Sequence, residues 1–118
     1  MSNKFLFIFL LIATITGFGF LLSDRDRFDT DIQTVNLKSG DFFFIPNTVK
    51  AKEGQTLEFN IENSGMHTFV INELNLKKVL NEGKNSFKLK FDRRGMFTFY
   101  CDVAGHREAG QFGTLFVE

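Results

Sequence analysis

The sequence predicts an all-β sandwich preceded by an N-terminal hydrophobic helix. From Ile32 onward, short runs of alternating apolar and polar residues are separated by turn-forming residues, a pattern typical of two packed β-sheets. Seventeen phenylalanines and no tryptophan supply large apolar side chains for a small core. The 118 residues of the chain leave room for one such domain and little else.

Eight segments carry the strand pattern. They are Ile32–Leu37, Phe42–Phe44, Thr48–Ala51, Thr56–Glu62, Thr68–Ile71, Ser86–Phe91, Met96–Cys101 and Gly113–Val117. The breaks between them contain Gly, Asn, Asp or Pro, which favour turns because of their backbone preferences and local hydrogen bonds. Asn72–Leu80 has only a weak apolar face, and we expect a short helix or an irregular segment there.

The alternation in Met96–Cys101 predicts on which side of the strand the side chain of the only cysteine lies. Phe97, Phe99 and Cys101 lie on one side of this strand, and the intervening residues lie on the other. The aromatic side faces the core, so we expect Cys101 to be buried at the end of a strand. A thiol in that position is held rigidly and kept dry.

The N-terminus predicts the compartment. Lys4 precedes Phe5–Leu22, an uncharged run of eighteen residues that fits a membrane-spanning signal-anchor or a cleaved signal peptide. We therefore divide the chain into a leader over 1–22, a short charged tether over 23–31 and a folded domain over 32–118. Both interpretations of the leader place the domain outside the cytoplasm, in the periplasm or at the cell surface, and the anchor attaches it to the membrane.

The charge balance and the single cysteine limit the classes of function that the chain can have. Fourteen basic and fourteen acidic side chains balance, which gives no indication of a nucleic-acid partner. Basic residues concentrate in one stretch, which we interpret as a solvated sheet face, with a docking patch for an acidic redox partner as the alternative. They are Lys77, Lys78, Lys84, Lys88, Lys90, Arg93 and Arg94. A single cysteine excludes an intrachain disulfide and leaves a free thiol or a metal ligand.

Four residues form a candidate metal site. Cys101, His106 and Gln111 follow one another at intervals of five residues in a loop that leaves the cysteine-bearing strand, and His67 follows a turn 34 residues before Cys101. A thiolate and two imidazoles with a weak polar ligand are the set that a mononuclear copper electron-transfer site requires. For any one of these residues, an ordinary role in the core or on a loop is the usual explanation. Their coincidence favours copper, with zinc as the less suited ion.

These motifs resemble those of the cupredoxins, or blue copper proteins. The resemblance rests on Cys-x4-His-x4-Gln, which follows the motif Gly95-Met-Phe-Thr-Phe-Tyr100, and on an upstream Asn-x3-His that ends at His67, and it extends over residues 32–118. It implies a Greek-key β-sandwich with one type 1 copper ion. It further implies that His67 and His106 ligate through ring nitrogens, that Cys101 provides the short sulfur bond, and that Gln111 is the axial ligand.

Gln111 departs from the commonest cupredoxin pattern, which has Met at the axial position. A glutamine there resembles the stellacyanin branch of the plant phytocyanins, although the disulfide of that branch cannot form in this chain. Because an amide oxygen is a harder ligand than a thioether, we expect it to favour Cu(II) over Cu(I).

The resemblance implies single-electron transfer without turnover of a substrate, so we expect no enzymatic activity. We expect a monomer that exchanges electrons with a donor and an acceptor redox protein through a surface near His106. Small and apolar residues line that surface: Val103, Ala104, Ala109 and Phe112. The main alternative is a module for copper storage, delivery or sensing. A Cys-His catalytic pair is disfavoured because Cys101 is predicted to face inward, and a metal-free structural sandwich is a third possibility.

Overall fold

The computed structural model describes residues 31–118, of which Ile32–Glu118 form one compact unit. The leader expected over 1–22 and all but the last residue of the expected tether lie outside the described residues. Within residues 31–118, no helix has the length and the apolar character needed to cross a membrane.

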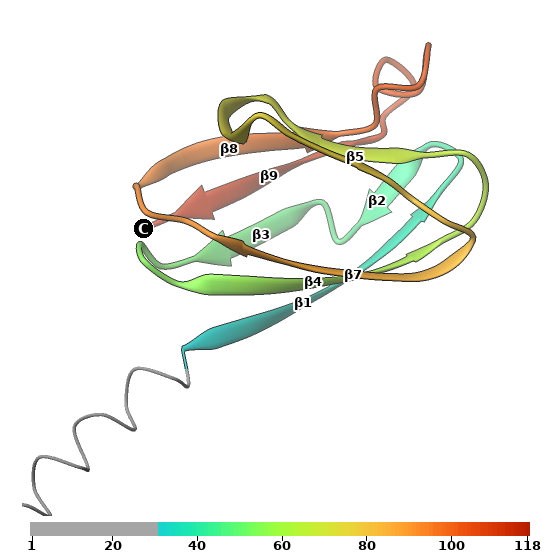
Figure 1. Cartoon of the computed structure of the whole chain (residues 1–118). Coiled ribbons are helices and arrows are strands. Elements are labelled where there is room, and N and C mark those ends of the chain that lie inside the picture. Colours follow the sequence, from blue (N-terminus) through green and yellow to red (C-terminus); the bar gives the residue numbers. More distant parts are fainter. Residues whose placement is uncertain (1–30) are drawn as a thin grey trace, which may run out of the picture. The chain divides into compact units, whose positions relative to one another are not determined.

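Two β-sheets pack face to face (Figure 1). The first contains, in order across the sheet, β2 (Phe43–Ile45), β1 (Ile32–Gly40), β4 (Thr56–Asn63) and β7 (Gly83–Lys90). The second contains β3 (Thr48–Ala51), β9 (Phe112–Val117), β8 (Gly95–Tyr100), β5 (Thr68–Ile71) and β6 (Leu76–Val79). β1 runs parallel to β4, and β3 runs parallel to β9, whereas the other paired strands are antiparallel. The predicted all-β sandwich is confirmed.

Phenylalanines fill the space between the sheets. Phe69 of β5 is fully buried, and its ring centroid lies 5.3 Å from those of Phe59 and Phe99. It also lies 5.4 Å from the ring of Phe87 and 5.8 Å from that of Phe44. These separations fall in the range of favourable ring pairs. The core therefore ties β2, β4, β5, β7 and β8 together, and Cys101 belongs to it.

The segment Asn72–Leu80 differs from its prediction. A single 3-10 turn, Asn72–Leu74, is followed by the strand β6, which pairs with β5 and forms one edge of its sheet. The sequence concealed this strand because two consecutive lysines, Lys77 and Lys78, interrupt the apolar alternation. Lysines are a common means of protecting an exposed strand edge from further pairing.

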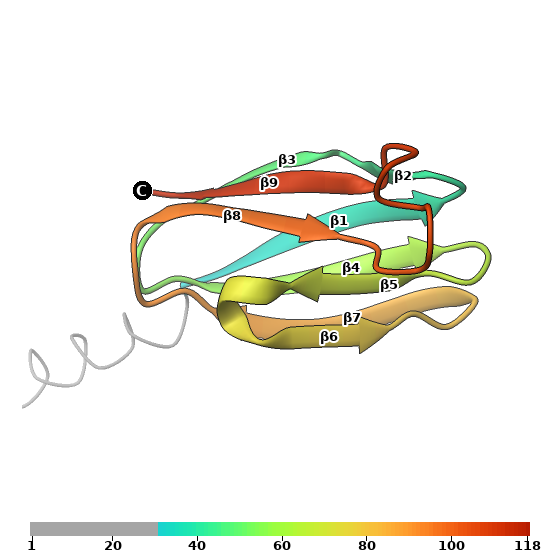
Figure 2. The same ribbon diagram turned by 90° about the horizontal axis from the view of Figure 1, so that it is seen from above.

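Three connections meet at the end of the sandwich that lies opposite the C-terminus. The turn between β1 and β2, the connection from β4 to β5, and the long loop between β8 and β9 are adjacent there in both views (Figures 1 and 2). They carry Asp41, His67 and the predicted ligands of the β8–β9 loop. The topology thus brings together residues that are far apart in the sequence.

Gly113 lies in β9 beside this loop, where the neighbouring residues leave no room for a side chain. A Cβ atom at this position of β9 would overlap the ring of the buried Phe99 and lie 2.7 Å from the carbonyl oxygen of Asn47. We expect Gly113→Ala to lower the free energy of unfolding by about 1–2 kcal/mol, because overpacking forces neighbouring atoms to move. Chemical denaturation measures the change. Adding Phe99→Leu should restore part of the loss, and a Gly113→Ala variant as stable as the wild type would contradict the packing described here.

Candidate metal centre

Three of the predicted ligands converge on one point. The Nδ1 atoms of His67 and His106 are 3.2 Å apart, and the sulfur of Cys101 lies 4.0 Å from the first and 3.6 Å from the second. The point equidistant from these atoms in their plane is about 2.1 Å from each, close to the roughly 2.0–2.3 Å bonds that imidazole and thiolate make to a metal. Within residues 31–118, these are the side chains that could jointly hold a metal ion.

The backbone of the β8–β9 loop links its three predicted ligands directly. The N–H of Cys101 donates to the carbonyl of Gln111 at 3.0 Å, and the N–H of Gln111 donates to the carbonyl of His106 at 3.0 Å. Gly105 and Gly110 have φ angles of 82° and 117°, which side-chain-bearing residues rarely adopt. These two glycines allow turns that close the loop, so that it can direct Cys101 and His106 to the same point.

His67 is positioned by the turn that precedes β5. The Asn63 amide donates to the carbonyl of Gly65 at 2.9 Å, and the N–H of Gly65 donates to the Glu82 carboxylate at 2.8 Å. Oδ1 of Asp41 lies 3.1 Å from Nε2 of His67, whose side chain is fully buried. A carboxylate at that position favours the tautomer with the proton on Nε2. Nδ1 then keeps a lone pair for a metal.

The sulfur of Cys101 is fully buried, as the strand alternation predicts. The backbone N–H of Thr68 donates to it at 3.4 Å. The next residue, Asp102, accepts a hydrogen bond from the Thr68 hydroxyl and pairs with Lys77 of β6 at 2.8 Å. Hydrogen bonds from Lys77 and from Thr68 lower the pKa of the Asp102 carboxyl, and the same carboxylate raises the pKa of Lys77. A charged group thus lies directly beside the cysteine.

Gln111 is completely buried, although the sequence alone also allowed an exposed loop position. Its Nε2 donates to the hydroxyl of Ser39 at 3.2 Å, while its Oε1 has no hydrogen-bond partner. A buried amide oxygen without a partner is costly and calls for an explanation. The two imidazoles and the thiolate of the His67–Cys101–His106 cluster fit the predicted copper, and Gln111 lies in the same loop as two of these residues.

Sequence reasoning missed four residues that support this cluster. Ser39, Asp41 and Thr68 contact Gln111, His67 and Cys101, respectively, and Asp102 exchanges hydrogen bonds with Thr68. Thr68 and Asp102 directly follow His67 and Cys101, and this adjacency was the available signal. The contacts of Ser39 and Asp41 depend on how the β1–β2 turn packs, for which the sequence has no local signal.

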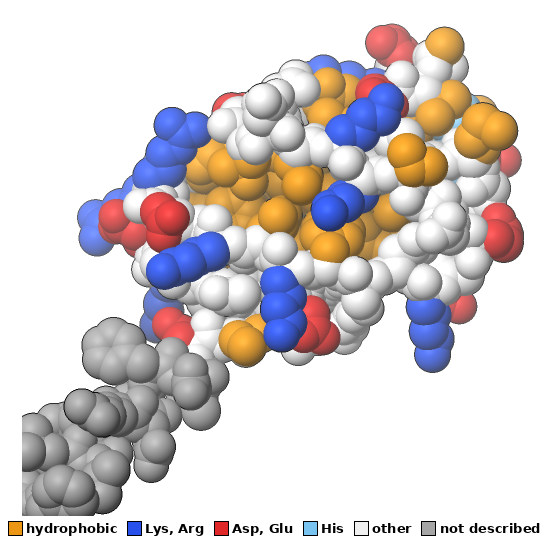
Figure 3. Space-filling view, in the orientation of Figure 1, with side chains coloured by type: hydrophobic (Ala, Val, Ile, Leu, Met, Phe, Trp, Pro, Cys, Tyr) orange, Lys and Arg blue, Asp and Glu red, His pale blue; other side chains and the backbone are white. Residues whose placement is uncertain are grey.

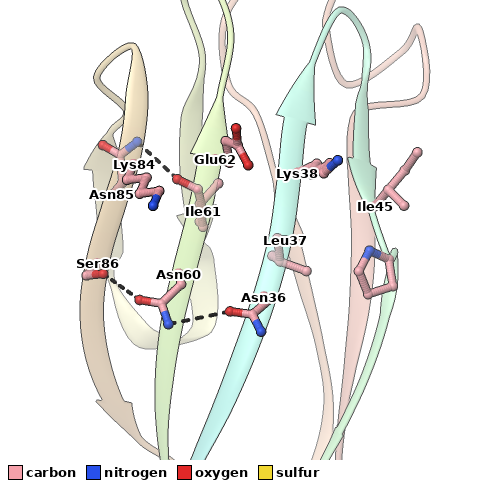
Figure 4. A pocket seen from close by; sticks show the side chains of 11 residues that line it. Asn36, Leu37, Lys38, Ile45, Asn60, Ile61, Glu62, Lys84, Asn85 and Ser86 are labelled. Atoms are coloured by element: carbon pink, nitrogen blue, oxygen red, sulfur yellow. Dashed lines mark hydrogen bonds between the residues drawn. The ribbon is translucent and has the colours of Figure 1, made fainter.

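A separate hollow lies on the outer face of the four-stranded sheet (Figure 4). Its volume is about 740 Å³. Side chains from β1, β4 and β7 meet in it, where the amide of Asn60 contacts Asn36 and accepts from the hydroxyl of Ser86. These polar groups pair with one another, and the residues lining the hollow include neither histidine nor cysteine. The chemistry of the chain is therefore concentrated at the loop end of the sandwich.

Half of the eight basic residues between positions 77 and 107 lie near an acidic side chain. Lys77, Lys88, Lys90 and Arg94 each lie within 4.0 Å of a carboxylate oxygen. On the face shown in Figure 3, Lys and Arg side chains lie around and over a broad hydrophobic area. The side chains of Lys77, Lys88, Lys90 and Arg94 are more than half exposed, which is consistent with the solvated sheet face favoured from the sequence.

Comparisons with known proteins agree with the fold and with the cluster. The model of the cupredoxin-like domain family matches residues 8–115, and the chain belongs to this family. Plastocyanin from Scenedesmus fuscus is 30% identical in an alignment of 92 positions that covers 68% of this chain and 91% of the relative. Plastocyanin from Dryopteris crassirhizoma is 27% identical in an alignment of 95 positions that covers 67% of this chain and 91% of the relative.

A solved structure shares the fold at lower identity. Reduced auracyanin from Roseiflexus castenholzii superposes with a TM-score of 0.63 at 18% sequence identity, over 73% of this chain and 97% of that protein. Together, the family and the clustered His67, Cys101 and His106 assign one type 1 copper ion to this chain.

Proposed function

We propose that the chain transfers single electrons through a mononuclear type 1 copper centre. The observation that carries this proposal is the convergence of Nδ1 of His67, Nδ1 of His106 and the Cys101 sulfur, 3.2–4.0 Å apart. Bound copper would supply the redox chemistry by alternating between Cu(II) and Cu(I). No substrate would be turned over in this function, so we expect no enzymatic activity.

His67 and His106 would act as the nitrogen ligands and Cys101 as the thiolate ligand. Gln111 would be the axial ligand through Oε1, since its Nε2 already donates to Ser39. The unpartnered Oε1 supports this role. The resemblance to the stellacyanin branch depends on this oxygen being the axial ligand.

The protein's contribution would be to keep these donors in place when the charge of the site changes. The backbone hydrogen bonds from Cys101 to Gln111 and from Gln111 to His106 need no metal. His67 lies at the start of β5, which is anchored in the core through Phe69. A site whose donors are already held moves little on electron transfer, and this lowers the reorganisation that limits the rate.

His106 would be the route by which electrons leave the site. It is partly exposed, and the ring of Phe42 packs edge-on against it at 4.9 Å between centroids. Phe42, Met66 and Phe112 are 44%, 80% and 48% exposed. In Figure 3, hydrophobic side chains lie next to an exposed part of a histidine at the end of the sandwich that carries the ligand loop. Such a surface suits transient contact with a redox donor and an acceptor, whereas the chain itself would remain monomeric.

We further propose that the copper domain over 32–118 acts outside the cytoplasm, in the periplasm or at the cell surface. The hydrophobic run Phe5–Leu22 would serve as a membrane anchor or a signal peptide, and 23–31 would be the tether. The support for this layout is the sequence of the first 31 residues.

Copper storage, delivery or sensing is the second candidate. Met66, which directly precedes His67, is highly exposed and offers a soft thioether beside the site. Against delivery, Met66 and Met96 are the only methionines after the leader, whereas Cu(I) carriers usually recruit several soft ligands.

A spectrum of the copper-loaded chain tests the proposal. We expect one copper per chain, intense visible thiolate-to-copper absorption with Cu(II), and tight binding of both oxidation states. Optical titration and electron paramagnetic resonance measure the first two, and competition with chelators measures the third. A chain that binds Cu(I) alone and passes it to an acceptor would favour delivery. A colourless chain without bound metal would exclude both candidates.

A further inference from the structure

A chain of polar contacts leads from the surface to the sulfur of Cys101. Nζ of Lys77 lies 2.8 Å from Oδ2 of Asp102, and Oδ1 of the same carboxylate accepts from the Thr68 hydroxyl at 2.7 Å. The N–H of Asp102 donates back to that hydroxyl at 2.9 Å. The N–H of Thr68 then donates to the cysteine sulfur at 3.4 Å. We call Lys77, Asp102 and Thr68 the clamp.

The position of one proton decides how the clamp acts. The Thr68 hydroxyl lies 3.7 Å from the sulfur of Cys101 but 2.7 Å from the Asp102 carboxylate. A hydroxyl has one proton to donate, and the short bond to a charged acceptor is the stronger one. The hydroxyl proton is therefore directed to Asp102. The sulfur receives its hydrogen bond from the Thr68 backbone.

The strand pairing explains why a clamp is needed at this point. β5 and β8 are joined in register at a single residue pair, Val70 and Tyr100. The same antiparallel register places Thr68 opposite Asp102, beyond the end of β8. At this point, hydrogen bonds that involve the Thr68 and Asp102 side chains connect the two segments in place of hydrogen bonds between the two backbones. Thr68 is 7% exposed, so its bonds are protected from water, whereas the Lys77 side chain is 55% exposed.

We propose that Lys77 and Asp102 are positioning residues that act through Thr68 to hold its backbone N–H against the Cys101 sulfur and thereby raise the reduction potential of the copper. This inference rests on the proposed copper function. A hydrogen bond to the sulfur withdraws electron density from the thiolate, and hydrogen bonding around this atom is a recognised means of tuning the potential of such sites. Loosening the N–H leaves more charge on the sulfur, which favours Cu(II).

The hydroxyl of Thr68 provides a test that changes no charge. Thr68→Val keeps the shape and the backbone N–H but removes the bonds to Asp102, whereas Thr68→Ser keeps the hydroxyl. In the metal-free full chain, we expect hydrogen exchange of the residue-68 amide to accelerate about tenfold in the valine variant, the scale of one lost hydrogen bond to a charged group. In the copper-loaded chain, the valine variant should have a lower reduction potential, and the serine variant should stay near the wild type.

Lys77 provides a second test with a matched control. Lys77→Met and Lys78→Met each remove one positive charge from adjacent positions of β6, but Lys78 lies over the Phe87 ring and not against the clamp. We expect Lys77→Met to lower the potential and to speed amide exchange at Thr68, whereas Lys78→Met should do neither to a comparable extent. Lys77→Arg should restore both properties, because it keeps the pairing with Asp102.

The outcomes separate the clamp from the copper function. Equal reduction potentials for Thr68→Val and the wild type would overturn the positioning role, because the bond to Asp102 would then not matter. Equal shifts for Lys77→Met and Lys78→Met would also overturn it, because the loss of one positive charge would then explain both shifts. If the wild-type chain binds no copper, the proposed function fails. Amide exchange in the metal-free chain would still show whether Lys77 and Asp102 hold Thr68.

Discussion

Cys101→Ser is expected to abolish the intense visible absorption of the copper-loaded chain and to weaken copper binding severely. Serine fits the same buried position, but its hydroxyl is not deprotonated as readily and is a much harder ligand than a thiolate. The loss of affinity should exceed the roughly 100-fold that removal of an outer-shell partner costs. Isothermal titration and the optical spectrum measure both effects.

The variant also separates a metal site from a structural cysteine. The metal-free forms of the wild type and of Cys101→Ser should both melt cooperatively, and copper should raise the melting temperature of the wild type far more. If Cys101→Ser retained the colour and the affinity of the wild type, the thiolate would not be a ligand. The proposed electron-transfer function would then be wrong.

Local patterns predicted the parts of the site that lie within a single element. Period-two alternation put Phe97, Phe99 and Cys101 inside, and all three are buried. The five-residue spacing of Cys101 and His106 in one loop predicted that they belong to one site, and their donor atoms lie 3.6 Å apart. Such features depend on backbone periodicity and turn chemistry, which the sequence encodes directly.

Features that depend on packing between distant elements could not be predicted. The strand β6 pairs at an edge, where lysines replace the apolar alternation. The approach of Ser39 to Gln111 joins residues 72 positions apart, and that of Asp41 to His67 requires the β1–β2 turn to fold over the site. No local signal fixes these contacts, because they follow from the register and the stacking of the two sheets.

The supporting contacts divide the site into two parts. Asp41 lies against His67 and Ser39 holds Gln111, and both come from the β1–β2 side. The Cys101 sulfur instead receives its hydrogen bond from Thr68 of β5. Residues of the first sheet would thus set the basicity of the His67 imidazole and the position of the axial ligand Gln111. Thr68 of the second sheet would set the electron density on the Cys101 sulfur. These influences can be changed separately by mutation.

Gln111→Met is expected to raise the reduction potential of the copper site. A thioether is softer than an amide oxygen, so it stabilises Cu(I) relative to Cu(II). Methionine is close to glutamine in volume and fits a fully buried position. We expect an increase on the order of 100 mV, about a 50-fold change in preference between the two oxidation states at 59 mV per tenfold for one electron. Voltammetry of the copper-loaded chain measures it.

Gln111→Glu is the matched comparison, because it keeps an oxygen of the same reach and adds negative charge. Its potential should fall below that of the wild type, since the carboxylate favours the more highly charged ion. Ser39→Ala removes the partner of Gln111 Nε2 without altering the oxygen. We expect it to shift the reduction potential less than Gln111→Met does. If Gln111→Met has an equal or lower potential than the wild type, Oε1 is not the axial ligand. The unpartnered amide oxygen would then require another explanation.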